Sequence, residues 1–357
     1  MSPLTTTAVS VAARPAPETP TGGAFPARGP RVLWLLAAVV VLALVTLASF
    51  AIGARGLTLD TVWQAVTRFD PANGDHAVVH ARIPRTILGL LAGAALGLAG
   101  AAMQGVARNP LADPGIIGIN AGAALAVVTG IYVFGVSSLS GYIWFAFVGA
   151  AAAAVVVYLI ASLGRDGATP VKLALAGAAL SAGLFSLMNV ILVSSRDTLD
   201  RFRFWQVGGI AGRDWSVILP GLPFLLLGAV MVLATGRILN NLALGDDIAR
   251  GLGQRVGLAR GITALGIVLL CGSATALAGP IGFVGLIIPH AVRFLTGPDY
   301  RWILPFSLVL APALLLSADV IGRVVLLPGE VPAGIMTALV GAPAFVWLVR
   351  RSKGAGL

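Results

Sequence analysis

Residues 82–125 read RIPRTILGLLAGAALGLAGAAMQGVARNPLADPGIIGINAGAAL, and this stretch decides the fold. Residues 87–106 within it carry no charged side chain. About 20 apolar residues, each rising roughly 1.5 Å in a helix, cross the roughly 30 Å hydrocarbon core of a bilayer. The apolar run is continuous rather than alternating, which favours a membrane-spanning helix over a strand of a membrane barrel.

The rest of the 357-residue chain repeats this pattern. It is 58% hydrophobic and 11% charged, with a mean hydropathy of +0.95, whereas about 25% charge is usual in soluble domains. Gly and Pro near Asp113 and at Gly279–Pro280 leave open whether two pairs of apolar segments are single bent helices. Counted separately, the segments predict an all-α integral membrane protein with ten spans, at 32–53, 84–106, 114–134, 142–163, 171–194, 216–236, 260–278, 281–296, 303–319 and 331–349.

The basic residues predict the orientation. The formal net charge is +10, and nearly all of this excess lies in the segments on the side of the N-terminus, so the positive-inside rule places both termini in the cytoplasm. Residues 1–30 are predicted to be a disordered cytoplasmic tail, residues 31–350 the ten-helix domain, and residues 351–357 a short cytoplasmic tail. The basic residues form no patch with interleaved aromatics, which argues against nucleic-acid binding.

The search for chemistry in the sequence finds few candidates. There is no G-x-x-x-x-G-K-[ST], H-E-x-x-H or G-x-S-x-G motif, so we expect neither an enzyme nor a cofactor site. The single cysteine, Cys271, is expected to face lipid or another helix. His76 and His80 are expected in a solvated loop rather than at a metal. The acidic residues lie near span ends or in loops, with Asp319 closest to an exception. That disfavours an ion-coupled secondary transporter, which remains the alternative function.

Two loops have distinctive patterns. In the cytoplasmic loop 237–260, apolar residues repeat every four positions behind two aspartates and before two glycines, which predicts a short amphipathic helix. That helix lies on lipid headgroups or inserts into a groove of a soluble partner. On the outer side, Pro84 is predicted in the first turn of a helix. Arg82 and Arg85 then face outward, either as snorkelling anchors or as a docking point for carboxylates.

The opening stretch and four further motifs resemble the permease family that imports iron-siderophores, haem and cobalamin with an ABC ATPase. The motifs follow in the family order and, with the opening stretch, cover about residues 30–350. They are LGDDIARGLG from Leu244, AGPIGFVGLIIPHAVRF from Ala278, ADVIGR at 318–323 and EVPAGIMTALVGAPAFVWL at 330–348.

The resemblance implies a multi-pass subunit of the bacterial cytoplasmic membrane. A second permease subunit, identical or paralogous, shares one central path with it. Two cytoplasmic ATPase subunits bind ATP and Mg, and an extracytoplasmic binding protein delivers the substrate. The resemblance further implies inward transport of a metal chelate by alternating access, with no reaction in this chain. A ferric siderophore is the first candidate, and haem or cobalamin remain open.

The resemblance also implies roles for particular residues. Docking of the binding protein falls to Arg82, Arg85 and Arg323. Asp246 stands where many relatives have Glu. Coupling to the ATPase falls to Leu244, Gly245, Asp246, Ile248, Ala249, Arg250, Leu252 and Gly253. Structural roles fall to Asn109, Pro110, Pro114, Gly115, Gly279, Gly282, Pro289 and His290.

Overall fold

Ten apolar helices form the body of the protein in this computed structural model, which describes residues 28–163 and 169–353. They confirm the ten predicted spans, and both doubtful pairs are separate helices. Within the described residues, seven helices are long and apolar enough to cross a membrane: α1 (Arg28–Ala51), α3 (Gly74–Ala107), α5 (Leu139–Ser162), α6 (Pro170–Ser194), α8 (Trp215–Ala234), α11 (Val256–Ala278) and α13 (Tyr300–Val325). Three shorter apolar helices complete the set: α4 (Ile119–Phe134), α12 (Val284–Thr296) and α14 (Ala333–Lys353).

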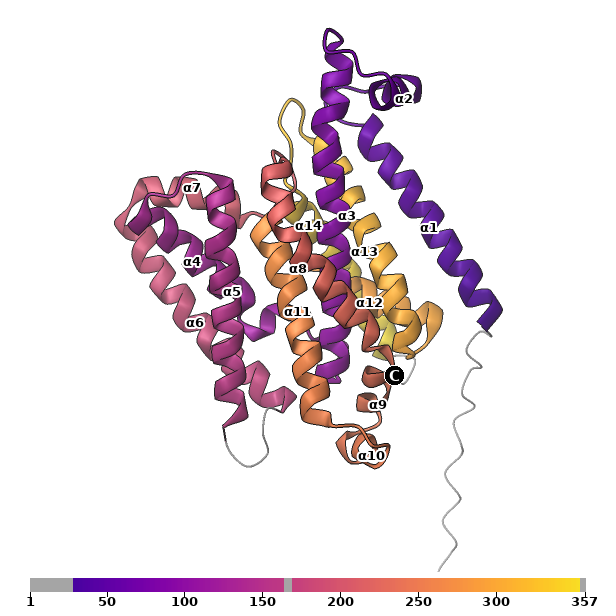
Figure 1. Cartoon of the computed structure of the whole chain (residues 1–357), viewed down its shortest axis with the longest axis vertical. Coiled ribbons are helices and arrows are strands. Elements are labelled where there is room, and N and C mark those ends of the chain that lie inside the picture. Colours follow the sequence, from indigo (N-terminus) through magenta and orange to yellow (C-terminus); the bar gives the residue numbers. More distant parts are fainter. Residues whose placement is uncertain (1–27, 164–168, 354–357) are drawn as a thin grey trace, which may run out of the picture.

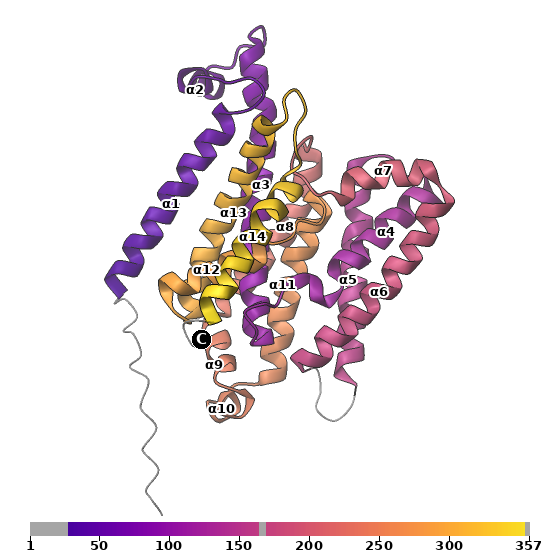
Figure 2. The same cartoon turned by 180° about the vertical axis from the view of Figure 1, so that it is seen from behind.

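Short helices lie at the two ends of this bundle. Figures 1 and 2 show α2 (Leu59–Thr67) and α7 (Arg196–Gln206) at one end, which is the outer end in the predicted orientation. At the other end lie α9 (Gly236–Ala243) and α10 (Asp246–Gly251), together with the start of α1 and the end of α14. The predicted tails 1–30 and 351–357 fall largely outside the described residues.

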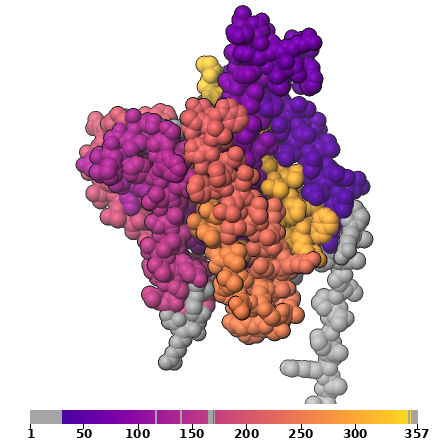
Figure 3. Space-filling model, in the orientation of Figure 1, coloured from indigo at the N-terminus to yellow at the C-terminus, as the bar shows by residue number. Residues whose placement is uncertain are grey.

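The helices divide into two groups. Figures 1 and 2 show α4, α5, α6 and α7 together on one side, and α1 at the opposite edge of the molecule. Helices α4 and α5 connect the first group to the rest by packing on α11, while α1 packs on α13. In space-filling form the magenta group is a distinct lobe beside the orange α11 and its neighbours (Figure 3).

Helix α3 runs through the centre of the larger group and packs on α11, α12 and α13. Its small residues permit this contact. A Cβ at Gly93 or Gly97 would overlap Pro312 or Ala311 of α13, and a Cβ at Gly100 would overlap the backbone of Gly285 in α12. The glycine spacing of the sequence therefore marks helix-to-helix contacts, as it does in other membrane helices.

Substituting Gly100 by alanine is expected to destabilise the protein by at least about 1–3 kcal/mol, because the new methyl group meets backbone that cannot rotate away. Thermal unfolding of the detergent-solubilised protein measures the loss. Gly183→Ala is the matched control, since a Cβ at Gly183 of α6 meets nothing within 4 Å. Equal melting temperatures for the two variants would show that α3 and α12 do not pack in this way.

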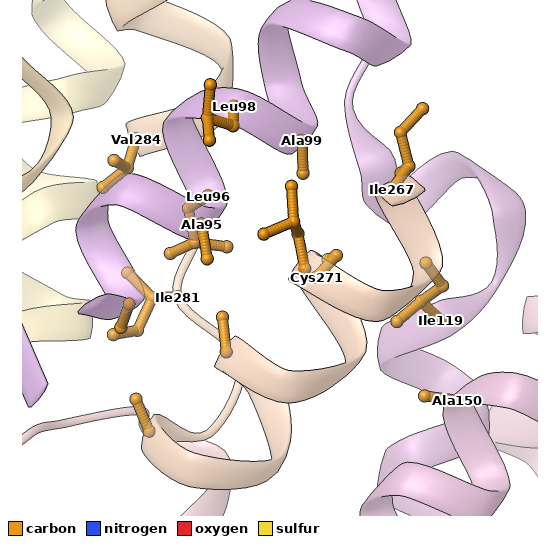
Figure 4. Packing of buried hydrophobic residues seen from close by; sticks show 14 of the residues in the cluster. Ala95, Leu96, Leu98, Ala99, Ile119, Ala150, Ile267, Cys271, Ile281 and Val284 are labelled. Atoms are coloured by element: carbon orange, nitrogen blue, oxygen red, sulfur yellow. The ribbon is translucent and has the colours of Figure 1, made fainter. Parts of the chain in front are cut away.

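The core between α3, α11 and the neighbouring helices consists of small and aliphatic side chains. Figure 4 shows Ala95, Leu96, Leu98 and Ala99 of α3 in this core together with Ile267 and Cys271 of α11. Cys271 is buried, so of its two predicted environments the helix-facing one is confirmed.

Helix α3 begins earlier than the sequence predicted, at Gly74. The Asn73 side chain accepts a hydrogen bond from the Asp75 amide and caps the helix. Two expectations are therefore wrong. Pro84 lies in the interior of α3, not in its first turn. His76 and His80 lie on a helix, not in a solvated loop, and His76 is buried, with Nδ1 accepting from the Asp70 amide at 3.0 Å.

Candidate functional site

The three predicted docking arginines gather at the outer end of the bundle. Arg82 and Arg85 lie one turn apart on α3, and Arg323 lies near the outer end of α13. Arg82 and Arg323 hold the end of α1 against these two helices. The C-terminal carbonyl groups of a helix lack partners inside the helix, and guanidinium groups satisfy them well.

Arg82 binds the end of α1 and the chain that follows it. Its Nη1 donates to the Phe50 carbonyl oxygen and its Nη2 to the Arg55 carbonyl oxygen, both at 2.7 Å. Gly53 makes room for the guanidinium, because a Cβ there would lie 2.5 Å from Nη2. Arg82 is 9% exposed, so its two hydrogen bonds replace solvent that the group has lost.

Asp319 joins the other two arginines. Arg85 donates from Nε and Nη2 to the Asp319 carboxylate at 3.0 and 2.8 Å, and Arg323 donates from Nε to the same carboxylate at 2.9 Å. Arg323 Nη1 also donates to the Ser49 carbonyl oxygen of α1 at 2.7 Å. The side chains of Asp319 and Arg323 are each 1% exposed, so this pair lies out of water.

Glu330 is the most exposed member of the cluster. It follows α13 in the segment before α14, and its Oε2 accepts from Arg85 Nη1 at 2.7 Å. The Glu330 side chain is 37% exposed and that of Arg85 13%. We call these five residues the outer arginine cluster: Arg82, Arg85, Asp319, Arg323 and Glu330. Its three cations and two anions give the cluster a net charge of +1. Arg85 is the cation whose partner, Glu330, is exposed enough for another carboxylate to replace it.

Neither acidic member was predicted to belong to the site, although Asp319 was noted as the acidic residue nearest to lying within a span. Asp319 and Arg323 are four apart in ADVIGR, which is the spacing of an ion pair along one helix face, so a local signal was present. The contacts from Arg85 to Asp319 and Glu330 join residues 234 and 245 positions apart, and no spacing rule predicts them.

At the cytoplasmic end, the predicted coupling segment exposes an apolar face. Leu244, Ile248 and Leu252 are 58%, 54% and 60% exposed, and Ala249 is buried on the opposite side. The helix itself is shorter than predicted and spans only Asp246–Gly251. Gly245 and Gly253 flank it with φ of +113° and +80°, a conformation that glycine adopts without strain.

Asp246 fixes this segment to the rest of the protein. Its carboxylate pairs with Arg108 at the end of α3 and with Arg260 of α11, the latter at 2.9 Å. Partial burial raises the pKa of Asp246, but the charges of Arg260 and Arg108 outweigh that effect and hold the pKa below its usual value. On the exposed side, Arg250 pairs with Asp247 at 2.8 Å.

Helix α9 is attached to α13 by one amide side chain. Asn240 Nδ2 donates to Asp299 Oδ1 at 2.6 Å, and Asn240 Oδ1 accepts from the Tyr300 amide at 2.8 Å. Burial raises the pKa of Asp299, but hydrogen bonds from Arg301 and Asn240 outweigh it and lower the pKa to about 2. Tyr300 in turn accepts from Arg293 of α12 at 2.9 Å. These hydrogen bonds link α9 to both α12 and α13.

The model of the FecCD transport family matches residues 40–351. The chain belongs to the FecCD transport family. It is 46% identical to the ferric enterobactin transport system permease protein FepD of Escherichia coli over 89% of this chain and 95% of that protein. It is 42% identical to the probable siderophore transport system permease protein YfiZ of Bacillus subtilis over 89% and 96%.

A solved structure agrees with this assignment. A metal-chelate type ABC transporter in an inward-facing conformation matches with a TM-score of 0.79 and 30% identity, over 90% of this chain and 99% of that one. This FecCD protein is therefore a membrane protein of known architecture. Among its described residues, no three or more His, Cys, Asp or Glu form a group that could hold a metal ion.

The family-motif residues of this FecCD chain mostly shape turns. Asn109 follows α3, and its side chain accepts from the Leu111 amide at 2.9 Å. Pro110 lies in the same turn, and Pro114 and Gly115 begin the 3-10 helix η1 (Pro114–Ile117). The Gly115 amide donates to Asp113 Oδ1 at 2.7 Å, and burial raises the pKa of that carboxyl.

The remaining motif residues lie around α12. Gly279 ends α11 with φ of +75°, and a Cβ there would overlap the Trp205 carbonyl oxygen. Gly282 lies in the turn before α12, and nothing in the structure explains it, because a Cβ there meets open space. Pro289 and His290 lie inside α12. His290 is buried between Phe294 and Phe345, and neither ring nitrogen has a hydrogen-bond partner among the described residues.

Proposed function

We propose that this chain is the permease subunit of a binding-protein-dependent ABC importer, and that separate ATPase subunits bind ATP and Mg. The observation that carries the proposal is the apolar face of α10, which projects from the end of the bundle while Asp246 and Asn240 attach the segment firmly. An exposed apolar patch on a rigid element is typical of a surface that binds a partner.

A ferric siderophore is the proposed substrate. The support comes from the two relatives, whose names specify ferric enterobactin and a siderophore. Haem and cobalamin remain the alternatives from the family resemblance. All three substrates are large chelates, and an open path between two permease subunits, identical or paralogous, would suit them better than a closed pocket in one chain.

The proposed transport step is alternating access. Closure of the ATPase dimer pushes on Leu244, Ile248 and Leu252. Because Asn240 links α9 to the start of α13 and Tyr300 links α13 to Arg293 of α12, the push tilts α12 and α13. Arg85 and Arg323 hold the outer end of α13 to α3 and α1. The same tilt of α13 therefore strains the hydrogen bonds of the outer arginine cluster.

At the outer end we propose docking by exchange of carboxylates. Arg323 and Arg82 are buried and bonded within the chain, so an approaching protein meets Arg85 and Glu330 first. A glutamate of the binding protein takes the place of Glu330 on Arg85 and releases the segment before α14. The three arginines therefore have different proposed roles. Arg85 contacts the binding protein, and Arg82 and Arg323 position Arg85.

Charge changes at Arg85 and Glu330 should alter docking in opposite directions. Arg85→Gln is expected to weaken binding of the cognate binding protein at least about tenfold, because a charge-assisted pair is lost. Glu330→Gln is expected to strengthen binding severalfold, because the competing carboxylate is removed. Titration of labelled binding protein against the permease complex in nanodiscs measures both. Arg203→Gln on α7 is the control, and unchanged affinity in both test variants would refute the exchange.

Copurification separates the importer from the secondary transporter. Protein solubilised gently from its own host is expected to carry an ATPase subunit in stoichiometric amount. The proposal would be contradicted if this chain were recovered without an ATPase and if the membranes still transported the substrate after the ATPase was inactivated.

A further inference from the structure

A cavity of about 650 Å³ lies between α5 and α11 near their cytoplasmic ends, and the proposed transport step makes no use of it. Its walls are largely apolar, with Val155 and Leu159 of α5 facing Ala264 and Leu265 of α11, and Met103 of α3 among the lining residues. Figure 3 shows the surface hollowed between the magenta and orange segments that contain α5 and α11.

Two glycines keep the α11 wall of the cavity open. Gly257 and Gly261 both line it, and a Cβ built at either position meets no atom within 4 Å. These glycines differ from Gly93, Gly97 and Gly100, which each touch a neighbouring helix. Here the missing side chains leave space that no other part of the described chain fills.

The cytoplasmic rim of the cavity carries unsatisfied positive charge. Arg255 is exposed, and its guanidinium makes no hydrogen bond or ion pair within the described residues. Arg260 Nε is an N–H donor without a hydrogen-bond partner in the described chain. Among the described residues that line the cavity, Asp246 is the one acid, and Arg108 and Arg260 already neutralise it.

We propose that this cavity binds an anionic phospholipid of the cytoplasmic leaflet. An acyl chain fills the apolar space along Ala264, Leu265 and Val268, deeper in the membrane. The headgroup lies beside Gly257 and Gly261, where the lipid phosphate contacts the guanidinium groups of Arg255 and Arg260. Basic pockets between membrane helices on the cytoplasmic side suit anionic headgroups. In the view of Figure 1, α5 and α11, which form the two walls of the cavity, stand in front of α14.

The occupant would contact three elements at once. Helix α10 supplies Arg250 to the rim, α11 supplies Arg260, and α5 supplies the opposite apolar wall. A bound lipid would therefore stiffen the coupling segment against the rest of the bundle. A phosphate ion alone would pair with the arginines but would leave the apolar part of the cavity unfilled. A lipid fills that part with its acyl chain, so the geometry favours the lipid.

Native mass spectrometry of the full-length chain in its assembled complex tests the proposal, with phosphatidylglycerol and phosphatidylcholine of identical acyl chains as probes. Wild type is expected to retain phosphatidylglycerol at least about fivefold better, the contribution of roughly one basic contact. Arg255→Gln should lose most of that preference. Gly261→Leu should lower retention of both lipids at least about fivefold, because its side chain fills the cavity.

Arg203→Gln and Gly183→Leu are the matched controls for charge and for volume, and both should retain lipid like wild type. Melting temperatures of all four variants show whether each one is folded. Equal retention of the two lipids by wild type, or unchanged retention in Arg255→Gln and Gly261→Leu, overturns the proposal. So does displacement of the lipid by inorganic phosphate, or lipid binding that appears only after the ATPase is removed.

Discussion

Asp319→Asn is expected to lower the free energy of unfolding by about 3–5 kcal/mol, the typical cost of leaving a buried charge without its partner. Arg85 and Arg323 both donate to this carboxylate, and its side chain is 1% exposed. Asparagine keeps the size of the side chain but removes the negative charge, so two guanidinium groups would remain close together out of water. Stabilities of about 5–15 kcal/mol leave little margin for this loss.

Thermal unfolding in detergent and the monodisperse fraction on size exclusion measure the effect of Asp319→Asn. Glu330→Gln is the matched control, since it removes the other carboxylate on Arg85 at a site where water replaces it. We expect the control to cost less than about 1 kcal/mol. If the two variants melt at the same temperature, Asp319 does not hold the outer ends of α3 and α13 together.

Ile248→Asp is expected to abolish uptake while leaving the fold intact. Ile248 is more than half exposed, so a charge at this position meets water in the isolated subunit. In the complex the same charge would be buried at the centre of the α10 face. Truncating a side chain at the centre of an interface commonly costs about 2 kcal/mol or more, or roughly 30-fold in affinity.

The amount of ATPase retained during purification checks this effect of Ile248→Asp. Leu59→Asp provides the control, because Leu59 of α2 is equally apolar and exposed but lies at the opposite end of the bundle. Normal ATPase retention by Ile248→Asp would show that α10 is not the coupling surface.

The ten spans could be predicted because length and absence of charge are properties of single segments. Their ends were harder to predict. Helix α13 continues to Val325, six residues past the predicted end, because Asp319 and Arg323 neutralise each other and so remain tolerable inside a helix. Helix α3 starts at Gly74 since Asn73 caps it within a segment whose polar composition suggested a loop.

Two outer helices escaped the sequence analysis for a related reason. Both α2 and α7 are short and amphipathic, and neither resembles a span. Capping signals were nevertheless present, since Thr58 accepts from the Thr61 amide and Ser195 from the Thr198 amide. A search for N-caps outside the apolar blocks would have found them.

In the candidate sites, too, the sequence predicted features within one segment but not contacts between distant segments. The four-residue spacing of Leu244, Ile248 and Leu252 predicted an apolar face, and the structure confirms that this face is exposed. Spacing also predicted that Arg82 and Arg85 face outward together. It could not show that Arg82 binds the end of α1, or that Arg85 shares Asp319 with Arg323, because those contacts depend on which helices are neighbours.

The central claim is that this chain moves a metal chelate with energy from a separate ATPase. Uptake of a ferric siderophore into proteoliposomes that contain the permease complex, with the loaded binding protein outside, tests it most directly. We expect uptake that requires ATP and Mg on the ATPase side, stops when the phosphate-binding lysine of the ATPase is replaced, and is insensitive to a protonophore. Uptake that continues without ATP and ends when the ion gradient is dissipated would contradict it.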